Sequence, residues 1–425
     1  MLPVSRKVVR ARLPAAVIAF GVASFFTDVG SEMIFPLLPA YVASLGASAI
    51  FLGLVEGVAD LTSSLLRLAS GYFTDRVERK KPLVLAGYAL ASLVRPLVAF
   101  ATAPWHVLAV RVTDRVGKGV RMAPRDVMLA ESVAHEDVGR AFGFQRALDH
   151  AGAVVGPLLA TALLGLGFSL QTVFLCAFIP GALAVVAVST VRESLPTKTR
   201  MDPGPEPRAD ASTAEVSVAA ASAAAASVAA PRPPVPEPLP ASLRAYFGIL
   251  LLFSVGCSSD AFLLLRAREL GVELAVIPLL WTVFHVSKAA TSYAGGAWSD
   301  RVSRVKLIVV GWAVYAATYL GFGLATQTWQ IWVLFVVYGA YYGFSEPAEK
   351  ALVRDLAPAS SRGRAFGYYN FMAGISAVPA GLLTGWLWQS VSPLAALATG
   401  AAIAALASAA ILVWSQMWNR PDVNQ

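Results

Sequence analysis

Three long stretches without a charged residue constrain this chain most strongly. They cover residues 158–191, 307–345 and 365–419. A helix needs about 20 mainly apolar residues to cross the hydrocarbon core of a bilayer, so each stretch is long enough for more than one crossing. Turn signals divide the stretches near 165–167, 326–328 and 390–393. The three stretches therefore predict six transmembrane helices.

Shorter apolar runs predict six more helices. These runs lie near 13–43, 49–73, 82–102, 105–127, 245–265 and 274–298. Only 14% of the residues are charged, whereas about a quarter of a soluble domain is charged. We therefore expect an all-α membrane protein of twelve transmembrane helices.

The distribution of basic residues predicts the orientation. The loops at 44–48, 101–104 and 326–330 contain no Lys or Arg. The loops of the other side and their flanks contain Arg76, Arg79, Lys80, Lys81, Arg140, Arg301, Arg304, Lys306, Lys350, Arg354, Arg362 and Arg364. By the positive-inside rule this second side and both termini are cytoplasmic. A charged external loop with Arg266, Arg268, Glu269 and Glu273 is the exception. The net charge of +8 thus indicates orientation and requires no nucleic-acid partner.

Composition and an internal repeat predict two halves. Residues 193–242 are rich in Pro, Ala and Ser and predict a disordered cytoplasmic linker between six-helix bundles at 1–192 and 243–425. The pentapeptide Gly139–Gly143 recurs identically at Gly363–Gly367. The pattern Gly-x-x-x-Asp-Arg-x-x-Arg at 71–79 also recurs at 296–304. The two offsets, 224 and 225 residues, agree closely and indicate a parallel duplication.

The repeated pattern resembles the loop signature of the major facilitator superfamily, a family of secondary transporters. Its residues here are Gly71, Asp75, Arg76 and Arg79 in the first half and Gly296, Asp300, Arg301 and Arg304 in the second. The resemblance implies two six-helix bundles and a cytoplasmic gate that these residues latch, because a carboxylate stabilises the positive end of a helix. In the alternative interpretation, the residues only end a helix and set the orientation.

A second pattern is similar to the signature that this family associates with antiporters and drug exporters. It consists of Gly152, Gly156 and Pro157 in the fifth predicted helix. Small residues four positions apart allow close helix packing, and proline bends a helix. The resemblance favours export, while ordinary helix packing is the alternative.

Acidic side chains within the predicted helices are candidates for proton coupling. Asp28 and Glu32 are four residues apart near the middle of the first helix, as are Glu56 and Asp60 in the second. Repulsion between two close carboxylates favours a proton on one of them, so such pairs can exchange protons near neutral pH. Asp149 in the fifth helix completes the set.

Basic side chains in the same helices are candidates for substrate binding, because a charge inside the membrane is costly and usually functional. These candidates are Arg67, Arg95, Arg111, Arg115, Lys118, Arg146 and Lys288. In the alternative interpretation, the acids and bases pair with one another and stabilise the bundle.

Together these features predict a proton-coupled secondary transporter that works by alternating access. They favour an efflux antiporter. Import of an organic anion and a non-transporting receptor are the alternatives. The sequence has no P-loop and no nucleophile-elbow, metal-ligand or disulfide pattern, so we expect neither an enzyme nor a cofactor or metal. The expected partners are protons, a small substrate and lipid. We expect a monomer in the inner (plasma) membrane of a bacterium.

Overall fold

The chain folds into helices and connecting loops in the part that the computed structural model describes, residues 13–74, 77, 79–134, 137–193, 238–299, 302–358 and 361–418. We call residues 13–193 the first half and residues 238–418 the second half. The predicted linker at 193–242 lies almost entirely outside the described residues.

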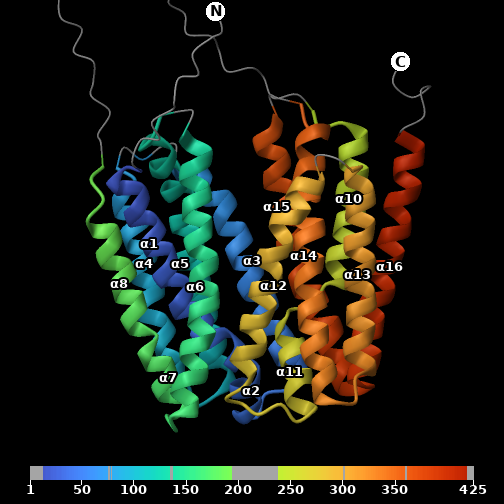
Figure 1. Cartoon of the computed structure of the whole chain (residues 1–425), viewed down its shortest axis with the longest axis horizontal. Coiled ribbons are helices and arrows are strands. Elements are labelled where there is room, and N and C mark those ends of the chain that lie inside the picture. The colour runs from blue at the N-terminus through green and yellow to red at the C-terminus, as the bar shows by residue number, and fades with distance from the viewer. Residues whose placement is uncertain are drawn as a thin grey trace, which may run out of the picture.

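The first half contains helical segments that pass repeatedly from one end of the molecule to the other (Figure 1). They are α1 (Ala15–Ile34), η1 (Phe35–Leu37), α2 (Leu38–Ser44), α3 (Ala49–Thr74), α4 (Lys81–Val94), η2 (Arg95–Phe100), α5 (Pro104–Glu131), α6 (Val138–Gly165), α7 (Leu170–Cys176) and α8 (Phe178–Ser189). Prolines lie at the breaks between consecutive segments: Pro36 and Pro39 follow α1, and Pro96 follows α4. Since proline lacks the N–H that an α-helix needs, it explains the short 3₁₀ turns there.

The second half repeats this arrangement (Figure 1). Its helices are α10 (Ala241–Gly256), α11 (Ala261–Glu269), α12 (Ile277–Ser299), α13 (Arg304–Leu324), α14 (Thr328–Leu356), α15 (Arg362–Ser390) and α16 (Pro393–Trp418). In the described part, nine segments are long and apolar enough to cross a membrane. Helices α5, α12 and α14 also reach that length, with 28, 23 and 29 residues, but they contain many polar side chains. The prediction of an all-helical membrane protein is confirmed.

The two halves contact each other unequally along their length. Helices α4, α13 and α15 begin with Lys81, Arg304 and Arg362. We call the end of the molecule where these helices begin, at the top of Figure 1, the basic end. Helix α3 packs along α15, and α6 packs along α12. At the opposite end α2 contacts α11 and η1 contacts α12. The halves are therefore closed against each other at the end away from the basic residues.

Helices α3 and α15 meet backbone to backbone where glycines face each other. A β-carbon placed on Gly53 would lie 2.0 Å from the carbonyl oxygen of Gly381, and one placed on Gly381 would lie 2.3 Å from that of Gly53. Only glycine permits so close an approach of two helices.

The structure corrects one prediction about the loops. Arg266, Arg268 and Glu269 were expected in a loop, but they lie in helix α11. The Arg266 guanidinium donates hydrogen bonds to the carbonyl oxygens of Phe322 (3.3 Å) and Ala325 (2.9 Å) at the end of α13. Because the free carbonyls at a helix C-terminus attract a cation, the charge is satisfied within the bundle.

Candidate functional site: a charged cavity between the two halves

A cavity of about 420 Å³ lies between the halves, on the basic-end side of their contact. Helices α1, α3, α4, α5 and α6 form one wall, and α12, α14 and α15 form the other. Arg146 and Lys350 line the cavity with side chains that are 61% and 42% exposed. The cavity is thus accessible to solvent from the basic end.

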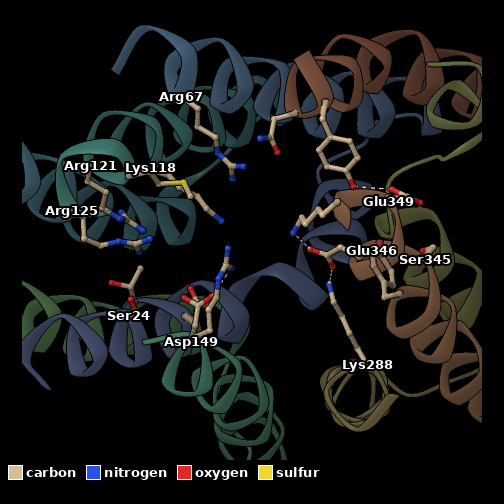
Figure 2. A pocket seen from close by; sticks show the side chains of 18 of the residues that line it. Ser24, Arg67, Lys118, Arg121, Arg125, Asp149, Lys288, Ser345, Glu346 and Glu349 are labelled. Atoms are coloured by element: carbon tan, nitrogen blue, oxygen red, sulfur yellow. Dashed lines mark hydrogen bonds and ion pairs between the residues drawn. The ribbon is translucent and has the colours of Figure 1, made fainter. Parts of the chain in front are cut away.

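The first-half wall is mainly cationic. Its basic residues are Arg67, Lys118, Arg121, Arg125 and Arg146, and its acids are Asp28 and Asp149. Figure 2 shows Arg67, Lys118, Arg121 and Arg125 reaching from one side toward the space between the walls. Lys118, Arg121 and Arg125 lie at i, i+3 and i+7 of α5 and therefore share one face of the helix. A negatively charged group would be attracted to this wall.

The second-half wall combines charge with aromatic rings. Glu346 lies 2.6 Å from Lys350 Nζ and 3.8 Å from Lys288 Nζ. Lys288 Nζ also lies 4.0 Å from the centre of the Tyr342 ring, a cation–π contact. Glu346 therefore lies between two lysines on this wall (Figure 2).

Glu349 is the most buried carboxylate of the second-half wall, with 6% of its surface exposed. It accepts hydrogen bonds from Trp312 Nε1 and from the Tyr369 hydroxyl, both at 2.8 Å. Both donors are neutral. Glu349 also borders an adjoining cavity of about 280 Å³, in which Tyr341, Tyr342 and Tyr369 recur as wall residues.

Six of the residues singled out from the sequence line the main cavity. They are Asp28, Arg67, Lys118, Arg146, Asp149 and Lys288. Arg146 and Asp149 lie 3.7 Å apart on successive turns of α6. The structure thus brings acids and bases from five helices together around one space.

Other predicted site residues form buried ion pairs away from this cavity. Arg95 Nε lies 2.7 Å from Asp114 Oδ1. Arg111 contacts Glu56 through two parallel hydrogen bonds of 3.1 and 2.6 Å. These four side chains are at most 9% exposed. For them, the structure favours the pairing interpretation over direct contact with a substrate.

A looser pair lies at the edge of the adjoining cavity. Arg115 Nη2 lies 3.8 Å from Asp60 Oδ1, and Glu56 and Asp60 both border the 280 Å³ space. The Asp60 side chain is 50% exposed. This pair is accordingly more accessible than those at Arg95 and Arg111.

Glu32 lies one helical turn beyond Asp28, at the closed end of the cavity. It accepts a hydrogen bond of 2.7 Å from Trp281 Nε1 of the second half. His285 Nε2 lies 3.8 Å from the same carboxylate and has no hydrogen-bond partner within the described chain. The Trp281 ring also packs against Phe35, with 5.1 Å between ring centres. Glu32 therefore belongs to a polar contact that joins the two halves.

The residues of the helix-packing motif lie where α6 crosses α1. A β-carbon on Gly152 would lie 2.3 Å from the Phe25 carbonyl oxygen, and one on Gly156 would lie 2.5 Å from that of Val29. Pro157 lies inside α6. The small residues thus allow α1, which contains Asp28 and Glu32, to lie directly against α6.

The predicted cytoplasmic gate is described only in part. Asp75, Arg76, Asp300 and Arg301 lie outside the described residues. Gly71 and Gly296 lie near the ends of α3 and α12. Arg79 lies in the segment between α3 and α4. Arg304 begins α13, donates a hydrogen bond of 2.9 Å to the Ala351 carbonyl oxygen and pairs with Asp355.

The sequence prediction of the site omitted four important charges. Arg121 and Arg125 of α5 and Glu346 and Glu349 of α14 line the cavity. A usable signal was present, because Arg121 and Arg125 continue the charged face that begins at Arg111.

The fold and the cavity define a membrane transporter built of two similar halves around a central site. The family model of the Major Facilitator Superfamily matches residues 20–265 and again residues 245–424. The chain therefore belongs to this superfamily of secondary transporters.

Individual relatives extend the comparison. An uncharacterized MFS-type transporter of Methanocaldococcus jannaschii is 29% identical over 92% of this chain and 93% of its own. The multidrug resistance protein MdtH of Cronobacter sakazakii is 23% identical over 85% of this chain and 84% of its own. The crystal structure of a POT family transporter in complex with 5-aminolevulinic acid superposes with a TM-score of 0.75 at 12% identity, covering 96% of this chain and 97% of the other. At that identity the likeness concerns the fold alone.

Proposed function

We propose that this chain is a proton-coupled transporter that exports a small molecule by alternating access. One observation supports this most directly: of two carboxylates on successive turns of α1, one lies in the cavity and the other lies in the closed contact. Asp28 lines the cavity, and Glu32 accepts the hydrogen bond that joins the halves. A proton on this pair can therefore act both at the binding site and at the contact that has to break.

The proposed orientation places the basic end in the cytoplasm. Arg79, Lys80, Lys81 and Arg304 lie at that end, and the positive-inside rule assigns such a side to the cytoplasm. In this orientation the cavity faces inward, both termini are cytoplasmic and the membrane is the plasma membrane. The predicted linker at 193–242 would then be cytoplasmic too.

The proposed coupling step follows from the contacts of Glu32. An ionised carboxylate accepts a stronger hydrogen bond than a neutral one, because one partner is charged. Protonation of Glu32 would weaken its hydrogen bond from Trp281 and its electrostatic contact with His285, and so would favour opening at the far end. Asp28, beside Lys118 and Asp149 in the cavity, is the group from which the proton would leave to the cytoplasm.

The direction of transport rests on separate support. The relatives named MdtH are multidrug resistance proteins, which favours export for this chain as well. Proton-coupled import of an organic anion is the second candidate, supported by the cationic first-half wall. A receptor on the same fold would bind ligand without moving it.

Transport in proteoliposomes tests this proposal. Purified protein would be reconstituted and supplied with ethidium as a cationic probe or radiolabelled phenyl phosphate as an anionic probe, with and without a pH gradient. We expect wild-type protein to accumulate one probe against its gradient. We expect Glu32→Gln and Asp28→Asn to lose this accumulation but to retain exchange of the probe at equal concentrations. An imposed gradient of either sign distinguishes export from import.

Glu131→Gln is the matched control, because Glu131 is a 54% exposed carboxylate paired with Lys80 outside the cavity. It should accumulate the probe as wild type does. Accumulation at the wild-type rate by both Glu32→Gln and Asp28→Asn would contradict the assignment of the proton sites. Binding without any flux would favour the receptor.

A further inference from the structure

The first-half wall presents charged donors that have no hydrogen-bond partner among the described residues. Arg121 is 4% exposed, yet its Nε and Nη1 atoms lack a hydrogen-bond partner within the described chain. Arg67 Nε is buried and unpartnered in the same sense. Buried polar atoms without partners are rare, and a charged one costs more than a neutral one. Both side chains line the cavity.

The neighbouring acids do not compensate these arginines. Asp149 is 3.7 Å from Arg146, and Arg125 is held by Asp126 through bonds of 3.0 and 2.7 Å. No ion pair among the described residues includes Arg67, Lys118 or Arg121. The first-half wall therefore carries more positive charge than its own carboxylates balance.

The Arg121 guanidinium is also fixed in position. Its central carbon lies 4.4 Å from the centre of the Tyr88 ring on α4. A β-carbon on Gly87 would come within 2.7 Å of the Arg121 β-carbon, so glycine there lets α4 approach α5 closely. A planar guanidinium held in one orientation binds a carboxylate, phosphate or sulfonate group through two parallel hydrogen bonds.

The opposite wall suits an aromatic or hydroxylated body. Tyr341, Tyr342, Ser345 and Asn370 face the same cavity, and the tyrosines continue into the adjoining space of about 280 Å³. The main cavity of about 420 Å³ falls within the usual range for small-molecule sites.

We propose that the substrate is a small organic anion, whose acidic head binds at Arg67, Lys118 and Arg121 and whose body lies against Tyr341 and Tyr342. This inference rests on the proposed transport function and specifies its substrate class. Glu56 and Asp114 pair with Arg111 and Arg95, so these two acids leave Arg67, Lys118 and Arg121 uncompensated.

Equilibrium binding to the purified full-length protein tests the inference without any gradient. The probes would share a phenyl group and differ in charge: phenyl phosphate, benzenesulfonate, benzyl alcohol and benzyltrimethylammonium, with inorganic phosphate as the head group alone. We expect the two aromatic anions to raise the melting temperature and to bind in calorimetry, more weakly as NaCl screens the charges. We expect the alcohol and the ammonium compound to do neither.

Two variants locate the head group. Arg121→Gln and Arg67→Gln should each lower phenyl phosphate affinity about 10- to 100-fold, the range expected for a lost hydrogen bond to a charged group. Two positions are used because either variant alone could fold poorly. Arg354→Gln is the matched control, since Arg354 is a 58% exposed arginine outside the cavity, and its affinity should equal that of wild type.

Three results would overturn the inference: stronger binding of the ammonium probe than of the anions, equal anion affinity in both cavity variants and wild type, or an equal loss in Arg354→Gln. The outcome is separable from that of the transport test. Anion binding without proton-driven flux would contradict only the proposed function. Proton-driven ethidium flux without anion binding would contradict only the substrate class.

Discussion

The two halves repeat one fold but place different chemistry at matching positions. In the first half Gly87 packs against the β-carbon of Arg121, and 224 residues later Gly311 packs against that of Ser345 in the same way. Both residues of the pair lie 224 positions from their counterparts, which agrees with the offset of the repeated pentapeptide. The same helix contact therefore carries a guanidinium in one half and a hydroxyl in the other.

A second pair of positions shows the same contrast. Arg95 and Asp114 form a buried ion pair of 2.7 Å in the first half. The residues 224 positions later, Tyr319 and Tyr338, pack with 5.9 Å between their ring centres. Since the second half folds with rings at these positions, the fold does not require the charges. A buried ion pair is generally no more stabilising than a well-packed apolar pair, so stability alone does not explain the first-half charges.

The largest expected effect on stability comes from breaking the ion pair between Arg95 and Asp114, and it tests whether the first half needs this pair to fold. Asp114→Leu leaves the Arg95 guanidinium buried without its carboxylate, and we expect it to cost about 3–5 kcal/mol of unfolding free energy. The double variant Arg95→Met with Asp114→Leu removes both charges and should recover most of the loss. Unfolding of the detergent-solubilised protein, followed by tryptophan fluorescence, measures both.

If the double variant is as unstable as Asp114→Leu, the first half needs this ion pair in order to fold. The contrast between the halves would then say nothing about function.

A smaller effect is expected at the two glycines. Gly87→Ala would place a β-carbon 2.7 Å from that of Arg121, and Gly311→Ala would place one 2.8 Å from that of Ser345. Each overpacked contact should cost about 1–3 kcal/mol of stability. Only Gly87→Ala displaces Arg121, so only this variant should lower phenyl phosphate affinity. Paired melting and calorimetry experiments separate the two effects, and an equal loss of affinity in both variants would show a global distortion instead.

The smallest effect concerns the ring beneath Arg121. The Tyr88 hydroxyl has no hydrogen-bond partner within the described residues, so Tyr88→Phe should leave anion affinity nearly unchanged. Tyr88→Leu removes the cation–π contact, worth about 0.5–2 kcal/mol, and should weaken phenyl phosphate binding about 2- to 30-fold. The comparison uses calorimetry at one salt concentration. Equal affinity in both variants would mean that the ring does not orient Arg121.

The sequence was sufficient to predict the helical fold, because the signal is local. Charge-free stretches such as 365–419 have to be divided into helices of membrane length, and α15 and α16 do divide there. The repeat could also be predicted, because two patterns recur at nearly the same offset. Both inferences needed only the spacing of residues along the chain.

The pairing of charges could not be predicted in this way. Arg111 and Glu56 are 55 residues apart. The spacing of charges within one helix does not indicate which residue of another helix will pair with them. Arg121 is a second example. Side chains near a helix end are often exposed to solvent, but Tyr88 and the packing of α4 bury Arg121. Contacts between helices decided the role of each charge.

The glycine contact between α3 and α15 has a mechanical consequence. At Gly53 and Gly381 the halves meet backbone to backbone, with no side chain of either residue between them. A turn of one half against the other at this point requires no change of rotamer and separates no interlocked side chains. If the halves turn against each other as we propose, this glycine contact offers little resistance, whereas the hydrogen bond from Trp281 to Glu32 has to break.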